Sequence, residues 1–422
     1  MLDRNVLRKE PDRVREAAAS KGEPCPLDEW AGLDRDRRQL LQKLEDLRRE
    51  RNELSEEVAR AKRAGEDADD LIQRSRAVGE DISSYEDQLP DVEKRMEELE
   101  LSFANLPDED VPRGPDESAN QEIRSWGEKP EFDFDPQPHW DLMGDALDQD
   151  ASVRVAGANF LLFRGWAARL QRTLINWMMD YHDENGYQEI WPPFVALEES
   201  MVTTGQIPKL QHDMYRVEKE EFYLAPTAEV QLTNVYRGTI IPEDDLPLRV
   251  CAYTPCFRRE AGSYGKETRG LNRVHQFEKV EIVCLEHPER SEDRLEEMLS
   301  QVERMLRLLE IPYRVMLLAT GDLSFAAAKC YDLEIWSAGQ EKWLEVSSVS
   351  NFRDFQARRG RIRFRPSEGG KTRFVHTLNG SGLALPRLIS AIVENNQDRE
   401  GGMRLPQVLA DSMGTDRIDS PG

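Results

Sequence analysis

The sequence predicts an α+β protein, with a long antiparallel α-helical coiled coil at the N-terminus followed by a domain built on a mainly antiparallel β-sheet flanked by helices. Apolar residues alternate at spacings of four and three between residues 27 and 106, which is the seam pattern of a coiled coil. From Ala151 the composition is globular, and helical and strand-like runs follow one another without β–α–β alternation.

The coiled coil is predicted as two helices that fold back on each other. Gly65 and the acidic residues after it supply the turn. Arg51 occupies one seam position, and Pro90 lies off the seam in the second helix, where we expect a kink or a local break. The apolar seam residues are Leu40, Leu44, Leu47, Leu54, Val58 and Ala61 in the first helix, and Val78, Ile82, Tyr85, Leu89, Val92, Met96, Leu99, Phe103 and Leu106 in the second.

Charge is unevenly divided between the two helices. Residues 35–65 hold ten cations and seven anions, whereas residues 66–100 hold four cations and thirteen anions. The first helix can therefore face a polyanion and the second cannot. A solvated coiled coil that only pairs proteins explains the same pattern equally well.

Residues 107–150 are rich in proline and acidic residues and are predicted to be a linker. Apolar spacing predicts a helix over 160–184, which Asn185 and Gly186 end. Strand-like runs are YQEIWPPFV, FYLAP, LRVCAYTPCF, HQFEKVEIVCL, YRVMLLA, YDLEIWS and KWLEVSSVSNF. The tail after Pro406 is predicted to be frayed.

The chain of 422 residues carries a formal charge of -24, and only 13 of its 57 basic residues are lysine. This composition favours a host with a salty cytoplasm, or else an ordinary acidic enzyme. It excludes general nucleic-acid binding, so such a partner must meet local basic patches. No apolar run could span a membrane and the N-terminus is charged, which predicts a soluble cytoplasmic protein. The five cysteines form no C-x-x-C pair, so neither disulfides nor a structural zinc are expected.

The segment Cys256–Phe277 gathers five cations around three glycines in this acidic chain. It is predicted to be a hairpin loop between two strands. Arg258 and Glu260 are predicted to share one strand face, where the arginine could bind a phosphate and the carboxylate an exocyclic amine, while Phe277 could stack on a base. A ladder of cross-strand ion pairs is the alternative.

Four further groups carry candidate chemistry. Glu345, Ser347 and Ser348 near a strand end offer hard oxygen ligands suited to magnesium. The run TLNGSGLALPR is predicted as a glycine-rich bend that leads into a helix near Ala384, with Arg387 in its first turn. In LAPTAEV, Thr227 and Glu229 are expected on one face of a strand or turn. Glu281 shares the strand face of Phe277.

These motifs, in this order, resemble those of class II aminoacyl-tRNA synthetases. GYQEIWPPFV, with Pro193, resembles motif 1, which forms the dimer interface in that family. CFRRE with RVHQFEKVE resembles motif 2, and GSGLALPR resembles motif 3. With the coiled coil, TGQIPK at 204–209, TAE at 227–229 and EVSSVSNFRDFQARR from Glu345, the chain resembles the seryl-tRNA synthetases of bacterial type over essentially its whole length.

The resemblance implies ATP-dependent activation of L-serine to seryl-adenylate, followed by transfer to the 3′ end of a serine tRNA, in a homodimer. A selenocysteine tRNA is a second candidate substrate under the same resemblance. It implies a tRNA-binding domain at 1–106 and a catalytic domain at 151–422. Arg258 and Arg387 would be catalytic, and Glu345 and Ser348 would hold Mg²⁺. The ATP-binding residues would be Arg258, Arg259, Glu260, Val274, Phe277, Glu345, Val346, Ser347, Ser348 and Arg387.

Serine and tRNA would be bound by separate sets of residues under the same resemblance. Glu281 would receive the hydroxyl of serine. The full serine set is Thr227, Ala228, Glu229, Arg258, Glu281, Asn379 and Ser381. The tRNA set on the first arm helix is Arg35, Arg38, Arg48, Arg49, Arg51, Arg60 and Arg63. Two alternatives remain, namely a ligase that loads an amino acid onto a carrier protein and a catalytically inactive paralogue that binds RNA.

Overall fold

The computed structural model describes residues 1–260 and 269–419, and these form two compact units. The N-terminal unit comprises Leu2–Ala19 and Glu23–Phe103. The larger unit comprises Met1, Ser20–Gly22 and the described residues from Ala104 onwards.

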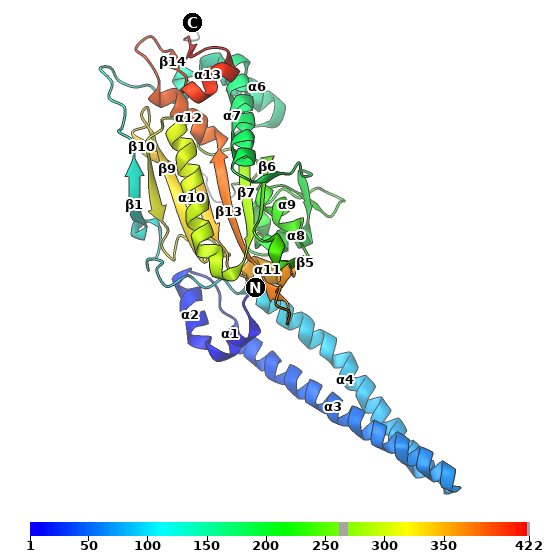
Figure 1. The fold of residues 1–422 in the computed structure, drawn as a ribbon. Coiled ribbons are helices and arrows are strands. Elements are labelled where there is room, and N and C mark those ends of the chain that lie inside the picture. Colours follow the sequence, from blue (N-terminus) through cyan, green and yellow to red (C-terminus); the bar gives the residue numbers. More distant parts are fainter. Residues whose placement is uncertain (261–268, 420–422) are drawn as a thin grey trace. The chain divides into compact units, whose positions relative to one another are not determined.

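The N-terminal unit contains the predicted helical hairpin (Figure 1). Gly65 caps the first long helix in the left-handed conformation, as predicted. Ion pairs between Arg37 and Glu93 and between Arg95 and Glu29 show that the two long helices run antiparallel. Its helices are α1 (Arg4–Lys9), α2 (Pro11–Ser20), α3 (Leu27–Ala64) and α4 (Asp69–Ser102).

The seam of the hairpin is apolar, as the spacing predicts. Leu44, Leu54, Val78 and Ile82 form a buried cluster between α3 and α4. Helix α4 continues through Pro90 without interruption, so the break considered there does not occur. Proline removes its own N–H from the ladder and crowds the carbonyl four residues earlier, and the packed seam compensates for that loss.

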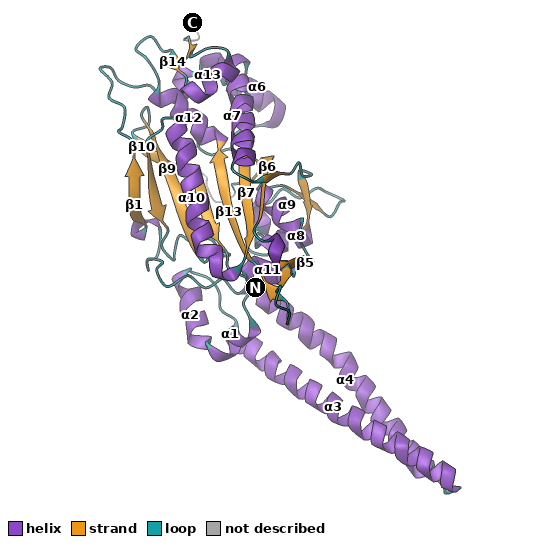
Figure 2. Ribbon diagram, viewed as in Figure 1, coloured by secondary structure: helices purple, strands orange, loops and turns teal. Residues whose placement is uncertain are grey.

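The larger unit is built on an eight-stranded sheet in the order β1-β8-β9-β10-β13-β7-β6-β2 (Figures 1 and 2). All its neighbouring strands pair antiparallel except β2 and β6, which confirms the predicted fold class. The strands of this sheet are β1 (Gln121–Trp126), β2 (Gln188–Glu189), β6 (Leu248–Phe257), β7 (Gln276–Glu286), β8 (Tyr313–Leu317), β9 (Lys329–Ser337), β10 (Lys342–Asn351) and β13 (His376–Ala384).

Helices α7, α10 and α12 pack on the sheet through the largest apolar core, to which they contribute Leu174, Leu299 and Ile389. Figure 2 shows them together over the strands. The helices of this unit are α5 (His139–Leu142), α6 (Gln149–Ala156), α7 (Gly165–Glu184), α8 (Glu198–Thr204), α9 (Ala228–Asn234), α10 (Ser291–Leu308), α11 (Phe355–Gly360), α12 (Leu385–Asn395) and α13 (Gln407–Met413).

Small elements complete the unit. The 3₁₀ turns are η1 (Glu117–Ala119), η2 (Gly144–Ala146), η3 (Gln211–Asp213), η4 (Glu243–Asp245) and η5 (Pro288–Arg290). The remaining strands are β3 (Val195–Leu197), β4 (Phe222–Leu224), β5 (Ile240–Pro242), β11 (Arg363–Arg365), β12 (Arg373–Phe374), β14 (Met403–Arg404) and β15 (Arg417–Ile418).

The structure differs from the predicted elements in several places. The run YQEIWPPFV, predicted as one strand, holds only β2 and the first residue of β3, which belong to different sheets. Helix α4 ends at Ser102, so the predicted seam residues Phe103 and Leu106 lie beyond it. The stretch 107–150, predicted to be a linker, contributes strand β1 to the sheet edge and the short helix α5. The helix expected from 160 begins at Gly165. The glycine-rich run before Arg387 is strand β13, in the middle of the sheet, and not a bend. The tail after Pro406 forms α13 and β15, with Leu409 fully buried.

The glycines of β13 explain why the sequence pattern predicts a bend there and not a strand. At Gly382 a Cβ would lie 2.6 Å from Nε2 of the buried His182 on α7, so the strand can pass the helix only without a side chain there.

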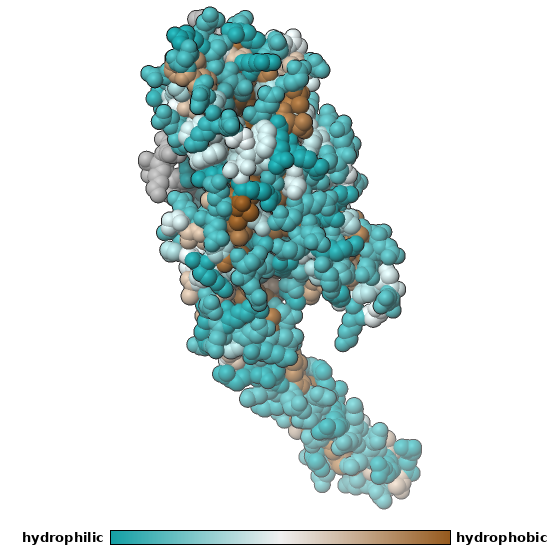
Figure 3. Space-filling view, turned by 60° about the vertical axis from the view of Figure 1, so that its left-hand side comes forward, coloured by the Kyte–Doolittle hydropathy of each residue, from teal (hydrophilic) through white to brown (hydrophobic). Residues whose placement is uncertain are grey.

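The surface seen in Figure 3 is mainly hydrophilic with separate small apolar patches. Among the described residues, no helix is both long and apolar enough to cross a membrane.

Candidate active site

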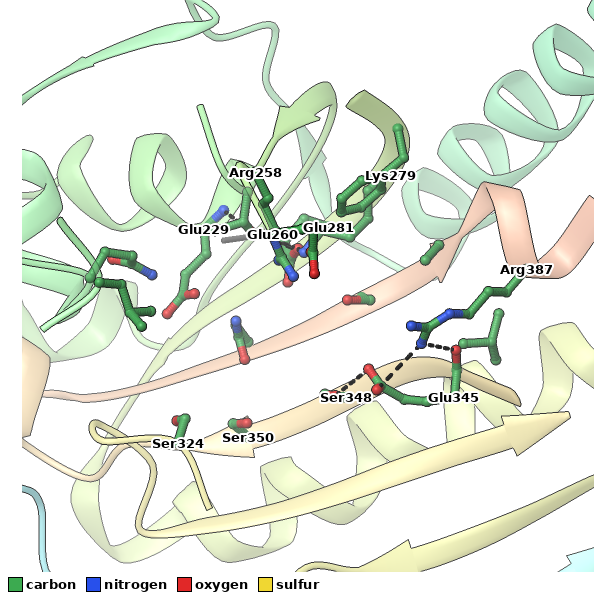
Figure 4. Close-up of a pocket in the computed structure, with 18 of the residues that line it drawn as sticks. Glu229, Arg258, Glu260, Lys279, Glu281, Ser324, Glu345, Ser348, Ser350 and Arg387 are labelled. Atoms are coloured by element: carbon green, nitrogen blue, oxygen red, sulfur yellow. Dashed lines mark hydrogen bonds and ion pairs between the residues drawn. The ribbon is translucent and has the colours of Figure 1, made fainter. Parts of the chain in front are cut away.

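One cavity of about 490 Å³ lies on the larger unit over strands β7, β13 and β10. Residues from the end of β6, the start of α9 and the start of α12 complete its walls. Figure 4 shows that the labelled carboxylates and arginines approach this space from different elements, among them strands β7 and β10 and helices α9 and α12. The cavity therefore gathers residues that are up to 183 positions apart in the chain, from Thr204 to Arg387.

Arg258 and Phe277 form a cation and aromatic pair at one end of the cavity. The guanidinium carbon of Arg258 lies 5.2 Å from the centre of the Phe277 ring, and its Nε donates to the carbonyl of Pro226 at 3.3 Å. Phe277 is opposite Cys256 in the β6–β7 ladder. A planar base beside this ring would therefore also be close to a cation.

Arg258 and Glu260 do not share a strand face as predicted, because both lie beyond the end of β6. Strand β6 ends at Phe257, and Glu260 has a left-handed backbone with φ of 49°. Glu260 still lines the cavity, where its carboxylate accepts from Arg273 at 3.2 Å. This ion pair joins two residues that both lie outside the strands, since β7 begins only at Gln276, and it is therefore not a cross-strand ladder. The tip of this loop, including Gly262, Gly265 and Lys266, lies outside the described residues.

Arg387, Glu345 and Ser348 form the second polar cluster, at the other end (Figure 4). Arg387 lies in the first turn of α12, and its Nη1 is 3.4 Å from Glu345 Oε2. Ser348 Oγ donates to Glu345 Oε1 at 3.4 Å. A β-bulge between Glu345 and Ser347 reverses the side-chain alternation, so that Glu345 and Ser348 both face the cavity although they are three residues apart.

Thr227, Lys279 and Glu281 form a buried polar group at the base of the cavity. Thr227 Oγ1 donates to Glu281 Oε2 at 2.9 Å, and Lys279 forms an ion pair with the same carboxylate. Glu281 is fully buried, and its Oε1 has no hydrogen-bond partner among the described residues. A buried carboxylate oxygen left unpaired is costly, which favours a ligand that donates to it.

Glu229 lies beside this group at the first turn of α9. Thr227 is the N-cap of this helix, and its hydroxyl accepts the Glu229 N–H at 3.3 Å, so the two residues sit at a helix start and not on a strand. Burial, reinforced by the charge of Glu281, raises the pKa of Glu229 to about 7. The amide of Gln356 donates to Glu229 Oε1 at 2.6 Å and partly opposes that shift.

Most of the predicted site residues line this cavity, and three do not. Ala228 is buried in the apolar cluster behind α9. Arg259 donates to the carbonyl of His212 at 3.2 Å, and the bulge turns Ser347 toward the carbonyl of Ser381. The predicted residues that line the cavity are Thr227, Glu229, Arg258, Glu260, Val274, Phe277, Glu281, Glu345, Val346, Ser348, Asn379, Ser381 and Arg387.

Several lining residues were not predicted from the sequence. Lys279 stands two positions before Glu281, so the alternation of strand β7 could have placed it on the same face. Asn272 and Arg273 follow the loop, and Ser324 lies between β8 and β9. No sequence pattern marks these three, because only the folded chain brings them to the cavity.

The seven arginines proposed for RNA contact all lie on α3 and are all exposed. Three of them form ion pairs within their own unit, Arg38 with Asp34, Arg48 with Glu86 and Arg49 with Asp46. Exposed ion pairs exchange readily for contacts with another anion.

Comparison with known proteins decides the family. Residues 1–107 match the seryl-tRNA synthetase N-terminal domain, and residues 213–396 match the tRNA synthetase class II core domain (G, H, P, S and T). The chain is 50% identical over 420 residues to the serine–tRNA ligase of Halothermothrix orenii, covering 99% of this chain and 100% of that protein. The chain belongs to the seryl-tRNA synthetase family. The serine–tRNA ligase of Thermomicrobium roseum is 49% identical over 98% of this chain and 94% of that protein.

Solved structures of seryl-tRNA synthetases share the fold. The enzyme from Pyrococcus horikoshii, complexed with ATP, superposes with a TM-score of 0.96 at 34% identity and covers 100% of both chains. The cytoplasmic serine–tRNA ligase from Naegleria fowleri, in complex with AMP, superposes with a TM-score of 0.90 at 28% identity, covering 100% of this chain and 99% of that one. The sequence-based assignment to the seryl-tRNA synthetases is confirmed.

Proposed function

We propose that this chain is a serine–tRNA ligase, which activates L-serine with ATP and transfers it to the 3′ end of a serine tRNA. The observation that supports this most strongly is that one cavity holds both a cationic and aromatic nucleotide clamp and a buried carboxylate, one oxygen of which has no hydrogen-bond partner in the described part of the chain. Glu281 supplies that oxygen, and Arg258, Phe277 and Arg387 supply the clamp. The serine–tRNA ligase names of full-length relatives agree with this proposal.

ATP would lie along the cavity, from Phe277 at the adenine end to Arg387 at the phosphate end. Glu260 would accept from the exocyclic amine, with Val274 against the ring. Arg258 would bind the α-phosphate and Arg387 the γ-phosphate, since guanidinium groups match phosphate oxygens bidentately. Both arginines are in the cavity wall in this structure.

The residues at the phosphate end fit a magnesium ion. Glu345 and Ser348 offer hard oxygen atoms 3.4 Å apart on the cavity side of β10. Mg²⁺ is typically held in such sites by one or two carboxylates plus substrate phosphates and water. The ion would neutralise phosphate charge when bound, and Glu345 would exchange part of its pairing with Arg387 for it.

L-serine would occupy the base of the cavity. Its hydroxyl would donate to Glu281 Oε1, and its ammonium group would pair with Glu229. Alanine and glycine lack the hydroxyl and would leave a buried acceptor unpaired, which costs about 1–3 kcal/mol or more for a charged group. Asn379 and Ser381 on β13 line the same part of the wall. Threonine must be excluded by lack of room for its methyl group.

The chemistry requires no covalent nucleophile from the protein. The serine carboxylate attacks the α-phosphate of ATP, and the bond from the α-phosphate to the β-phosphate breaks. The products are seryl-adenylate and free pyrophosphate. The 3′-terminal hydroxyl of the tRNA then attacks the activated carbonyl and releases AMP. Arg258 stabilises the negative charge that builds up at the α-phosphate, and positioning supplies the rest of the rate.

We propose separate roles for the two parts of the chain. Residues 1–106, with the arm from about 27, would bind tRNA through the α3 arginines, whereas the described residues of 151–422 would carry catalysis. RNA helices are recognised by shape and backbone, which suits arginines without a base-specific motif. A homodimer agrees with the exposed Trp191 of the motif 1 region, whose side chain is 71% exposed. We also propose that the protein is cytoplasmic, in a host whose cytoplasm is salty.

Serine-dependent ATP–pyrophosphate exchange tests the proposal. Exchange is expected with serine, and at least 100-fold less with alanine or threonine, over a salt series. Arg258→Ala is expected to reduce exchange at least 100-fold with an unchanged melting temperature. Arg237→Ala, which removes a half-buried arginine paired with Glu199, is the matched control and should keep full exchange. Absence of serine-dependent exchange in the wild type would refute the proposal.

Charging assays separate the alternatives. A carrier-protein ligase would form the adenylate yet load a carrier protein instead of tRNA, and an inactive paralogue would bind RNA without exchange. The presence of Arg258, Glu260 and Arg387 in one cavity argues against the inactive paralogue. The long α3–α4 hairpin argues against the carrier-protein ligase, because the synthetase-like ligases that load carrier proteins lack such an arm.

A further inference from the structure

His139 on α5 is a fully buried side chain that connects two walls of the cavity without lining it. Its Nδ1 lies 2.7 Å from Oε1 of Glu394 on α12. Its Nε2 lies 2.9 Å from the backbone nitrogen of Leu271, in the segment that returns from the hairpin loop toward β7. Leu271 is also fully buried. The imidazole thus bridges α12 and the return segment 269–274.

The hydrogen bonds determine the tautomer of His139. A backbone N–H can only donate, so Nε2 of His139 must be an unprotonated acceptor. The ring proton is then on Nδ1, where Glu394 Oε1 accepts it. Burial alone would raise the pKa of Glu394, but hydrogen bonds from His139 and Ser337 outweigh burial and hold the pKa below its ordinary value. Glu394 is therefore an ionised acceptor that orients the ring.

Contact between α5 and the return segment is close over three consecutive residues. A Cβ on Gly270 would lie 2.2 Å from His139 Nε2 and 2.8 Å from Trp140 Cε3, and Gly270 has φ of 70°, so only glycine fits there. The guanidinium carbon of Arg269 lies 4.9 Å from the centre of the Trp140 ring. The segment is thus docked on α5 immediately before it reaches the cavity.

The residues after Leu271 are part of the nucleotide wall. Asn272, Arg273 and Val274 all line the cavity. The carbonyl of Asn272 accepts from Arg387 Nε at 3.4 Å, and its side-chain amide donates to Gln340 at 2.8 Å. A shift of the Leu271 backbone would therefore displace both the adenine side of the wall and a contact of Arg387.

We propose that His139 is a positioning residue of the ATP site, acting through its hydrogen bond to the Leu271 N–H. The inference rests on the proposed function, because ATP is the ligand whose site it would shape. A purely structural role, in which His139 only stabilises the buried Glu394 network, is the alternative. The two roles use opposite ends of the ring, so they can be separated by substitution.

Two variants each retain one end of the ring. In His139→Gln the side-chain carbonyl can reach the Nε2 position and accept from Leu271, whereas the contact with Glu394 is lost. In His139→Asn the amide can donate to Glu394 but is too short to reach Leu271. Gln397→Ala is the matched control, because Gln397 holds the neighbouring Gln137 with hydrogen bonds of 2.8 and 3.0 Å and does not touch Leu271.

The experiment measures KM for ATP and for serine by pyrophosphate exchange, together with melting temperature. His139→Asn is expected to raise the ATP KM about tenfold with serine KM unchanged, the size expected for one lost hydrogen bond. His139→Gln is expected to stay within threefold of wild type, despite a similar fall in melting temperature. Gln397→Ala should lower the melting temperature without changing either KM.

Gly270→Ala provides a second test should the Asn variant fail to fold, since its methyl group would displace the segment from His139. Its ATP KM is expected to rise at least fivefold. Equal ATP KM values in the Asn and Gln variants, or an unchanged value in Gly270→Ala, would overturn the role of His139. Lack of exchange in the wild type would instead refute the proposed function. ATP binding by the same variants would then be compared through the rise in melting temperature that ATP produces.

Discussion

Thr227 and Glu281 share one hydrogen bond at the base of the cavity, in which the threonine hydroxyl donates to Oε2 at 2.9 Å. Lys279 pairs with the same carboxylate from two residues away on β7. The second oxygen, Oε1, has no partner within the described chain. The carboxylate is therefore fixed in orientation and has one acceptor to offer, which is the arrangement a hydroxyl-bearing amino acid requires.

Glu281→Ala should reduce kcat/KM for serine about 100-fold, because the fixed acceptor for the hydroxyl is lost. The alanine rate should change much less, so discrimination between serine and alanine should fall. Exchange with both amino acids measures this. Glu278→Gln is the matched control: it alters a carboxylate on the same strand that binds Tyr253 outside the cavity, and discrimination should persist. Unchanged discrimination in Glu281→Ala would contradict the assignment.

Serine binding should strengthen as pH rises toward about 7. The pKa of Glu229 is raised to about 7, so the free carboxyl is mainly protonated below that value and cannot pair with the serine ammonium. The serine KM should therefore rise up to about tenfold per pH unit below 7 and level off above it. Glu229→Gln should raise KM and remove this dependence. A serine KM independent of pH between 5.5 and 8 would disprove the role.

The same carboxyl should destabilise the ligand-free fold at neutral and higher pH. Between its ordinary pKa of 4.5 and the raised value of about 7, the folded state holds more protons than the unfolded chain. Stability therefore falls as pH rises through this window, and the loss is complete above 7. Glu229→Gln should gain at most about 3 kcal/mol at pH 8 and little at pH 4.5. Denaturant unfolding of both proteins at the two pH values measures the difference.

Glu345→Gln should raise the magnesium concentration needed for half-maximal exchange about tenfold, since one of two oxygen ligands loses its charge. Glu341→Gln removes an exposed carboxylate from the turn before β10 and serves as the control. A magnesium titration of both variants at saturating serine provides the measurement. Equal magnesium requirements in the two variants would count against a ligand role for Glu345.

Charge reversal on the arm should affect tRNA charging and not adenylate formation. The double variant Arg51→Glu and Arg60→Glu on α3 should lower charging at least tenfold and reduce the salt dependence of tRNA binding, while exchange stays normal. The same reversal at Arg74 and Arg76 on α4 is matched in charge and should have a smaller effect. Similar losses from both helices would contradict the predicted RNA face.

The sequence alone predicted the helical hairpin and the central strands, because these elements have strong periodic patterns. The heptad seam from Leu40 to Phe103 and the alternation in β6, β7, β9 and β10 do not depend on distant residues. The pattern does not predict strand β13 because its Gly382 is required by close packing against His182 of α7, which stands about two hundred residues away in the chain. Strand β1 and helix α5 were missed because they gain their structure from partners outside the proline-rich stretch.

Sequence by itself determined the family, the order of the motifs and the residue types at the cavity, since each motif is short and local. Tertiary structure decided which of those residues face the cavity. A single bulge in β10 turns Ser348 toward the cavity and Ser347 away from it. The positions of Thr227 and Glu229 are set by the start of helix α9, of which Thr227 is the N-cap, and not by a strand. The free oxygen of Glu281 and the link from His139 to Leu271 depend on burial and on contacts between distant segments, which no local pattern encodes.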